Sequence, residues 1–152
     1  MNLTFTLNGK AFSDLTSGSF RCKAFSGDGE HRNQWLHQCL KKKGPIPRGR
    51  YYIVDRPTGG RLGPIIDAVT RKGEWFALFA DDGRIDDYTF CSAVERGNFR
   101  LHPKGARGVS EGCIAVEKPN EYATLRNHLL CSMKIDVPGN TKIQAYGILT
   151  VK

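Results

Sequence analysis

Hydrophobic and polar residues alternate with period two near both ends of the chain. Residues 3–7 are Leu-Thr-Phe-Thr-Leu, and the Asn8-Gly9 pair that follows is a preferred sequence for a two-residue hairpin turn. We therefore predict a β-hairpin that begins with this segment. Residues 141–151 alternate in the same way after the turn sequence Pro-Gly-Asn at 138–140, which predicts a closing strand.

The middle of the chain contains strand patterns separated by turn residues. Residues 13–29 are rich in Ser, Gly, Thr and Asp, which is typical of short strands and loops. Two prolines within residues 44–49 exclude a helix there, and a strand is expected directly afterwards, at residues 50–54. Residues 74–80 are almost continuously apolar and predict a strand buried on both faces. Glycine, proline and aspartate predict a loop at residues 57–64 and a polar turn at residues 81–87.

One segment has the periodicity of an α-helix. Pro119 suits the first helical position, and Glu121 complements the positive end of the helix dipole. Residues 34–40 fit either a short second helix or an irregular loop. We predict a mainly β fold with one or two helices, formed by a single domain over residues 1–152. The apolar residues expected to face its core from the main helix are Tyr122, Leu125, Leu129, Leu130 and Met133.

The composition fits a globular protein that needs no disulfide bonds or structural metal ions to fold. The chain has 152 residues, of which 39% are hydrophobic and 25% are charged, so it is long enough to bury a core. No segment approaches the roughly 18 consecutive apolar residues of a membrane span, so we expect no membrane insertion. The first residues lack the basic and apolar regions of a signal peptide, so we expect export by another route.

The cysteines do not indicate a metal site or a disulfide framework. Their number is odd, and they lack the paired spacing of zinc ligands. We expect at least one unpaired thiol and no metal or other cofactor, with most of the cysteines buried as small apolar residues. Cys131 in particular is expected in the core, beside the apolar stripe of the helix. The cysteines are Cys22, Cys39, Cys91, Cys113 and Cys131.

The charge favours an anionic partner. The formal net charge is +8, which suits nucleic acid, an anionic membrane surface or a carboxylate-rich polymer such as peptidoglycan. The densest positive run, residues 41–43, precedes Gly44 and is typical of a solvated loop. Charge alone does not choose between these partners.

His102 and Cys113 end one expected strand, residues 99–102, and begin another, residues 113–116. A thiol is mostly protonated at neutral pH, so a nucleophilic cysteine needs a base nearby, and His102 is the closest histidine in sequence. Gly112 would leave room for a substrate carbonyl and for backbone N–H groups that stabilise an oxyanion. Ser110 would either orient the imidazole or line that oxyanion hole. The spacing alone fits equally well a buried cysteine and an unrelated surface histidine.

The wider pattern is more specific than the pair. Residues 102–105 (His-Pro-x-Gly) and 110–116 (Ser-x-Gly-Cys-Ile-x-Val) resemble the signature of L,D-transpeptidase catalytic domains. Residues 25–27 (Phe-Ser-Gly), Asn33 and residues 44–51 (Gly-Pro-Ile-Pro-x-Gly-x-Tyr) extend the similarity. Together these motifs resemble the type VI secretion L,D-transpeptidase effector family, formerly a domain of unknown function.

This resemblance covers roughly residues 20–150. It implies an L,D-transpeptidase-like, β-rich fold that a type VI apparatus injects into the periplasm of a competitor. It also implies attack on the bond between the L-centre of a diamino acid and a terminal D-alanine in peptidoglycan peptide stems. The resulting cysteine thioester would pass to water, giving carboxypeptidase activity, or to a D-amino acid, giving exchange. The implied partners are these stems, an immunity protein and a component of the secretion apparatus.

Carried over position by position, the resemblance makes Cys113 the nucleophile and His102 the base, with Ser110 and Gly112 as supporting positions. Housekeeping L,D-transpeptidases commonly have a histidine just before Gly-Cys and an arginine two residues after it. This chain has Glu111 and Ala115 there. The departures count against cross-linking more than against hydrolysis or exchange.

Other charged and titratable residues have weaker motif support. Arg107 is predicted to bind a stem carboxylate through its planar guanidinium, with a solvated surface arginine as the alternative. The remaining histidines are expected to be structural or surface residues: His31, His37 and His128.

Two rival functions remain. One is a basic nucleic-acid-binding module, supported by the charge and by aromatic residues near Arg or Lys, namely Trp35, Tyr51, Tyr52 and Phe99. The other is a cysteine amidase or endopeptidase that cleaves another peptidoglycan bond. Neither explains the combined motifs, so we expect no nucleic-acid partner.

Overall fold

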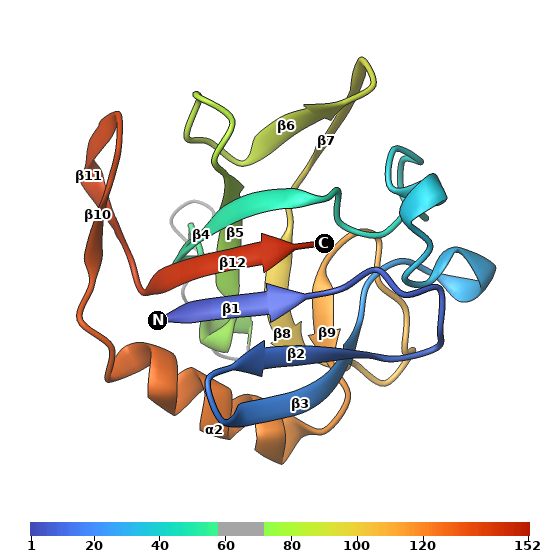
Figure 1. The fold of residues 1–152 in the computed structure, drawn as a ribbon, viewed down its shortest axis with the longest axis horizontal. Coiled ribbons are helices and arrows are strands. Elements are labelled where there is room, and N and C mark those ends of the chain that lie inside the picture. Colours follow the sequence, from blue (N-terminus) through green and yellow to red (C-terminus); the bar gives the residue numbers. More distant parts are fainter. Residues whose placement is uncertain (58–71) are drawn as a thin grey trace.

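The computed structural model describes residues 1–57 and 72–152. Within this part of the chain, eight strands close into a barrel (Figure 1). Neighbouring strands around the barrel follow the order β1 (Asn2–Phe5), β12 (Gly147–Val151), β4 (Gly49–Asp55), β5 (Phe76–Ala80), β8 (Arg100–Pro103), β9 (Ile114–Val116), β3 (Phe20–Phe25) and β2 (Ser13–Ser17).

Two neighbouring pairs in this barrel are parallel, namely β1 with β12 and β8 with β9, and the other pairs are antiparallel. The first and last strands therefore lie side by side, as Figure 1 shows. Side chains from all eight strands, including Phe5, Ile53 and Ile114, fill the interior. The expected mainly β fold is confirmed, and so are the strands expected near residues 50–54 and 74–80.

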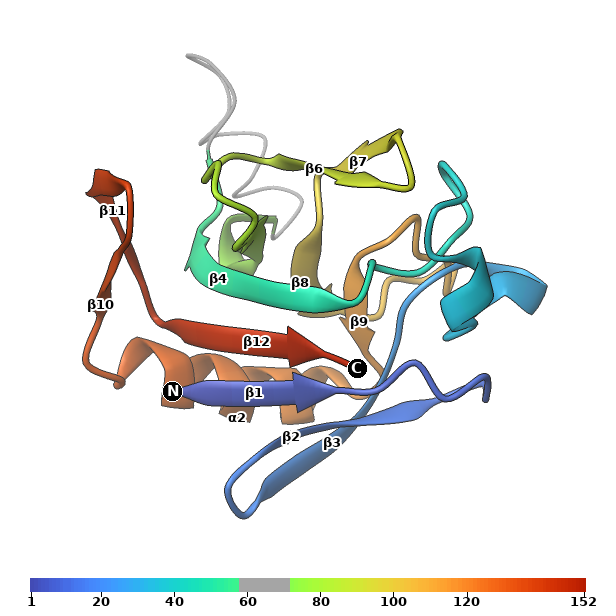
Figure 2. The ribbon, with the colours of Figure 1, turned by 45° about the horizontal axis from the view of Figure 1, so that its top comes forward.

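The helix α2 (Pro119–Leu130) covers one end of the barrel (Figure 2). It begins at the predicted proline and buries Tyr122, Leu125 and Leu129, which confirms these three members of the predicted stripe. The prediction was wrong for Leu130 and Met133, which are 42% and 90% exposed. Leu130 is the last residue of α2 and lies beside the buried Leu129 on the helix, turned towards solvent. The helix ends before Met133, so the helical spacing no longer places that residue over the core.

Two hairpins stand outside the barrel (Figure 2). One consists of β6 (Tyr88–Cys91) and β7 (Val94–Gly97), and the other of β10 (Ile135–Val137) and β11 (Asn140–Ala145). Val137 and Ala145 of the second hairpin pack with residues of β4 and β5 in a smaller hydrophobic cluster on the outside of the barrel.

The predictions for the two ends of the chain, an N-terminal hairpin and a C-terminal strand, hold only in part. β1 does pair with the next strand, but residues 6–12 connect them instead of a two-residue Asn-Gly turn. The reason is that Leu7 and Gly9 donate backbone hydrogen bonds to Lys152 and Asn33, which prolongs the connection. At the other end, the single strand expected at residues 141–151 is divided into β11 and β12. A side chain at Gly147 would collide with the backbone of Met1, so the glycine lets the chain pass from the hairpin into the barrel.

The shorter segments agree with their patterns where they are described. Residues 13–29 contain β2 and β3 together with the 3₁₀ turn η1 (Gly29–His31). Residues 34–40 contain only the 3₁₀ turn η2 (Trp35–His37), and residues 81–87 form the expected polar turn. Another 3₁₀ turn, η3 (Lys72–Glu74), precedes β5. Most of the loop expected at residues 57–64 lies outside the described residues.

The cysteines differ from expectation. Cys22 is buried as predicted, but Cys131 is exposed because the helix ends before it. Cys39 and Cys91 form a disulfide across 52 positions of sequence, with their Cα atoms 5.2 Å apart. The prediction that most cysteines are buried apolar residues was therefore wrong, because such long-range proximity depends on the fold rather than on local spacing. The disulfide links the loop after η2 to strand β6.

Candidate active site

Strands β8 and β9 bring the predicted pair to one face of the sheet. Their parallel register places Leu101 opposite Ile114, inside the barrel, and His102 opposite Ala115, outside it. Because successive residues of a strand point to opposite faces, Cys113, two residues before Ala115, lies on the same outer face as His102. Ladder spacing puts the two Cα atoms about 8 Å apart, and proton transfer between the two side chains stays a prediction.

His102 is held as a neutral base. Its side chain is buried, and its Nδ1 lies 2.8 Å from the carbonyl oxygen of Pro103, so Nδ1 donates and Nε2 keeps its lone pair. The ring stacks on Trp75, with the centroids 4.2 Å apart. Burial lowers the pKa of His102, and the bond to Pro103 offsets this lowering in part. The imidazole is therefore uncharged at neutral pH and able to accept a proton.

Cys113 is held as a protonated thiol. Its Sγ lies 3.7 Å from the carbonyl oxygen of Asn98. Burial is the main cause that raises the pKa of Cys113, and the carboxylates of Asp87 and Glu111 add to the effect. The backbone N–H and the charge of Arg100 act in the opposite direction. The thiol therefore needs a base to become a nucleophile, which is the role predicted for His102.

Sequence reasoning missed Arg100 and Trp75. Arg100 lies two residues before His102, on the same face of β8, and its guanidinium makes two hydrogen bonds of 2.6 and 2.5 Å to the carboxylate of Asp87. Strand alternation from His102 would have found Arg100. For Trp75 the only signal was an aromatic residue at the start of a buried strand, and its contact with His102 depends on the pairing of β5 with β8.

Gly112 occupies a position that only glycine tolerates. Its φ is +120°, and a Cβ there would lie 2.8 Å from the guanidinium of Arg96 and 2.9 Å from the ring of Phe99. The carbonyl oxygen of Gly112 accepts a hydrogen bond of 3.3 Å from the Ser26 hydroxyl. The backbone immediately before the nucleophile is therefore fixed by both sterics and hydrogen bonding.

Ser110 contacts the backbone of the nucleophile. Its hydroxyl is buried and donates a hydrogen bond of 2.6 Å to the carbonyl oxygen of Cys113. This contact differs from both roles considered for Ser110 on sequence grounds. We propose that Ser110 fixes the direction of the Cys113 backbone, with the role itself still a prediction.

The motifs at residues 25–33 and 44–51 support the loop that precedes β9. The Ser26 hydroxyl, which holds Gly112, accepts a hydrogen bond of 2.8 Å from the backbone N–H of Ile46. Asn33 is fully buried and accepts a hydrogen bond of 2.9 Å from the backbone N–H of Ser26. The Tyr51 hydroxyl donates a hydrogen bond of 2.7 Å to the carbonyl oxygen of Pro47. These motifs thus form the scaffold of the segment that presents Cys113.

Arg107 lies exposed in the loop between β8 and β9. The loop is anchored by Arg32, whose guanidinium donates a hydrogen bond of 2.9 Å to the carbonyl oxygen of Gly108. The predicted binding of a stem carboxylate by Arg107 remains a prediction.

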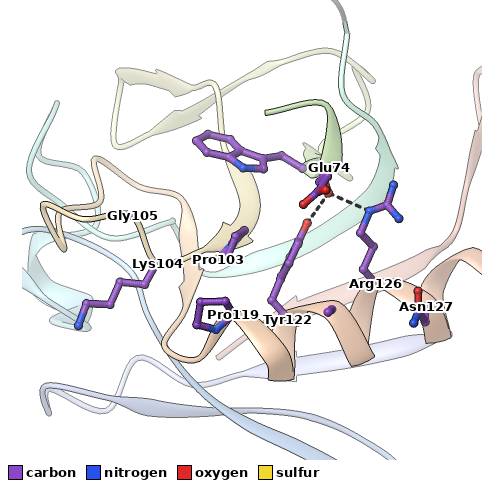
Figure 3. Close-up of a pocket in the computed structure, with 10 residues that line it drawn as sticks. Glu74, Pro103, Lys104, Gly105, Pro119, Tyr122, Arg126 and Asn127 are labelled. Carbon is purple, nitrogen blue, oxygen red and sulfur yellow. Dashed lines mark hydrogen bonds between the residues drawn. The ribbon is translucent and has the colours of Figure 1, made fainter. Parts of the chain in front are cut away.

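Two cavities are lined by neighbours of His102 and Cys113. A cavity of about 460 Å³ includes Trp75 and Pro103, which both contact His102. Figure 3 shows Tyr122 and Arg126 reaching into it from α2 towards Glu74, whose backbone carbonyl accepts hydrogen bonds of 2.6 and 3.3 Å from them. A smaller cavity of about 230 Å³ includes Asn98 and lies on the cysteine side.

The surface gives little support to nucleic-acid binding. Tyr51, Tyr52 and Phe99 are buried and cannot stack on bases, while Trp35 is 45% exposed. Among the described residues, no group of three or more His, Cys, Asp or Glu side chains is arranged to hold a metal ion. None of the helices in the described ranges has the length and apolarity to cross a membrane.

The fold is mainly β, with a closed barrel and one α-helix in the part of the chain that the structure describes. The family model of the Tlde1 domain matches residues 21–140, so the chain belongs to this type VI secretion L,D-transpeptidase effector family. The matched region contains both His102 and Cys113. Searches of curated proteins and of solved structures give no match.

Proposed function

We propose that this protein is an antibacterial cysteine enzyme that acts on peptidoglycan tetrapeptide stems in the periplasm of a target cell. The activity is L,D-carboxypeptidase, exchange of the terminal D-amino acid, or both. The proposal is supported mainly by the register of β8 and β9, from which we infer that neutral His102 and protonated Cys113, just before β9, share one face of the sheet. Family membership supports the effector role and an activity of the L,D-transpeptidase kind, and the peptidoglycan stem as substrate is part of this proposal.

The first half-reaction would form a thioester. Nε2 of His102 takes the proton of the Cys113 thiol as Sγ attacks the carbonyl carbon between the diamino acid and D-alanine. Backbone N–H groups at Gly112 and Cys113 are the nearest candidates to stabilise the oxyanion. When the C–N bond breaks, the imidazolium gives its proton to the nitrogen of the departing D-alanine.

The second half-reaction would release the acyl group. His102, neutral again, takes a proton from water or from the amine of a D-amino acid as that nucleophile attacks the thioester carbonyl. The C–S bond then breaks, and the proton passes to the sulfur of Cys113. Water yields a tripeptide stem, and a D-amino acid yields an exchanged tetrapeptide.

Delivery and self-protection follow from the effector role that the family implies. We propose that a component of the type VI apparatus carries the protein out of the producing cell. An immunity protein would protect the producer and its siblings by blocking the site.

Mass spectrometry of tetrapeptide muropeptides tests this function. The wild type is expected to release D-alanine, or to exchange it when a free D-amino acid is added. Cys113→Ala should give neither product because no thioester can form. Cys131→Ala changes an exposed thiol and should retain full activity.

Circular dichroism would show that both variants are folded. Loss of a whole stem, rather than of one D-alanine, would indicate an amidase or endopeptidase instead. Products formed equally by Cys113→Ala would refute the proposed nucleophile.

A further inference from the structure

The small cavity on the cysteine side has no part in the chemistry described so far. Its volume is about 230 Å³, and its wall includes Asn98 and Glu111. The carbonyl oxygen of Asn98 lies 3.7 Å from the Cys113 sulfur, and Glu111 precedes Cys113 by two residues. A small molecule in this cavity would therefore lie beside a thioester formed on Cys113.

The cavity wall carries charges of both signs. Its lining includes the basic residues Lys41, Lys42 and Arg96 and the acidic residues Glu95 and Glu111. A free amino acid at neutral pH carries one carboxylate and one ammonium group, so it can pair with both kinds of side chain. The lysine and glutamate side chains are exposed, so each contact is weak alone, and the cavity matters because it brings them together.

The turn that carries the lysines is anchored on both sides. The backbone N–H of Gly44 donates to the carbonyl oxygen of Leu40 at 3.1 Å, which closes the turn. Cys39, just before the turn, is joined to β6 by the disulfide. Arg96 of β7, a buried side chain, donates hydrogen bonds to the carbonyl oxygens of Gln38 and Gly44.

Residues 41–43 form an exposed turn, as expected from the sequence, and these contacts fix the ends of the turn to the β6–β7 hairpin. Figure 2 shows the segment before β4 on the same side of the molecule as the tip of this hairpin. Because the turn at residues 41–43 and the β6–β7 hairpin are joined, the backbone on both sides of the cavity keeps a constant arrangement.

We propose that this cavity is the subsite for the D-amino acid: the departing D-alanine in the first half-reaction and the incoming free D-amino acid in exchange. Lys41 and Lys42 bind the α-carboxylate, and Glu111 binds the ammonium group. The inference rests on the proposed function and gives Glu111 a role at the position where housekeeping enzymes commonly have histidine.

The exchange step balances with these groups. The carboxylate of Glu111 removes one proton from the ammonium group and releases it to solvent, which leaves a nucleophilic amine. The amine nitrogen forms a bond to the thioester carbonyl carbon, and its next proton passes to Nε2 of His102. The C–S bond breaks, and His102 returns this proton to the sulfur of Cys113.

The ratio of exchange to hydrolysis tests the subsite. Tetrapeptide muropeptide is incubated with increasing D-methionine, and exchanged tetrapeptide and tripeptide are quantified by mass spectrometry. Both products arise from the same thioester, so their ratio does not depend on the rate of acylation. The double variant Lys41→Gln/Lys42→Gln should lower the ratio about tenfold, which corresponds to the loss of one charged hydrogen bond.

Lys43→Gln is the matched control, because Lys43 belongs to the same turn but is not part of the described cavity wall. It should leave the ratio unchanged. Glu111→Gln should lower the ratio, since it removes the partner of the ammonium group. D-methionine amide, which lacks the carboxylate, should be a poorer acceptor than D-methionine for the wild type, and the double variant should lose this discrimination.

The outcomes separate the two proposals. If the wild type hydrolyses the stem but never exchanges D-methionine, or if the double variant behaves like Lys43→Gln, the subsite is refuted and the proposed enzyme stands. If the folded wild type forms neither product, the proposed function itself fails, and the subsite with it.

Discussion

At the scale of single residues, the decisive feature is that the resting pair carries no charge. Burial raises the pKa of Cys113 and lowers that of His102, so an ion pair of thiolate and imidazolium is disfavoured before substrate binds. The proton must then move during the attack on the substrate. This mechanism makes the rate depend on His102 being neutral.

The pH profile should show this dependence. The acid limb of kcat/KM is expected below the ordinary histidine pKa of about 6.5, because burial disfavours protonated His102. Trp75→Ala removes the ring that stacks on His102, so it should raise the pKa of His102 and move the acid limb to higher pH. Activity would then be lost at a higher pH as the solution is acidified.

Trp35→Ala provides the control for this experiment, because Trp35 is an exposed tryptophan that packs on Arg48 instead. The imidazole titration can be followed by NMR alongside the kinetics. An acid limb that stays in place when Trp75 is removed would contradict the assigned cause of the shift.

The nearness of His102 and Cys113 in the fold could be predicted from sequence because they lie at the ends of strands that a short loop connects, while their catalytic roles stay predictions. His102 and Cys113 meet through neighbouring elements, so local pattern and motif were sufficient. Arg96 could not be predicted in the same way. Its partners, Gln38 and Gly44, are more than fifty positions away, and nothing in the local pattern marks it as a buried side chain.

At the scale of elements, the loop before β9 holds Cys113 in a defined position because its backbone is constrained from several directions. Gly112 lies between Arg96 and Phe99 with a positive φ, while Ser26 and Ser110 bind carbonyl groups on either side of Cys113's N–H. The strands themselves were predictable from periodicity. The end of α2 and the division of the last strand were not, because both depend on where the chain must meet other elements.

Gly112→Ala should therefore destabilise the protein. The substitution places a Cβ at φ +120° and within 2.8 Å of Arg96, so we expect a loss of about 2 kcal/mol or more in the free energy of unfolding. Urea denaturation measures this loss. The remaining folded fraction should turn over substrate more slowly, since the backbone before Cys113 must move.

Gly105→Ala is the comparison within the same loop. A Cβ at Gly105 would meet no described atom within 4 Å, and its φ is not in the left-handed region, so stability should change little. Equal destabilisation by both substitutions would show that the loop is not constrained at Gly112 in the way that the contacts indicate.

At the scale of the whole molecule, the barrel and its attachments depend on different forces. The barrel is closed by strand pairing and filled with apolar side chains. The wall beside Cys113, by contrast, consists of the loop after η2 and the β6–β7 hairpin, which are held by Arg96 and the disulfide. Sequence patterns revealed the strands of the barrel, but the joining of these outer segments is a product of the closed fold.

On the proposed route to the target-cell periplasm, the disulfide should form after delivery, because the cytoplasm is reducing and the periplasm is oxidising. Closing a loop of 52 positions restricts the unfolded chain and should contribute about 2–4 kcal/mol. Reduction of the wild type should therefore lower the urea midpoint while far-UV circular dichroism keeps its β signal at low urea. Cys39→Ser/Cys91→Ser should match the reduced wild type and should not respond to reductant.

The disulfide also joins the two segments that line the proposed subsite beside Cys113, namely the loop after η2 and the β6–β7 hairpin. The reduced wild type and the double variant should therefore exchange D-amino acids less efficiently relative to hydrolysis. If the reduced wild type keeps its stability and its product ratio, Arg96 alone is sufficient to hold the loop after η2 against the β6–β7 hairpin.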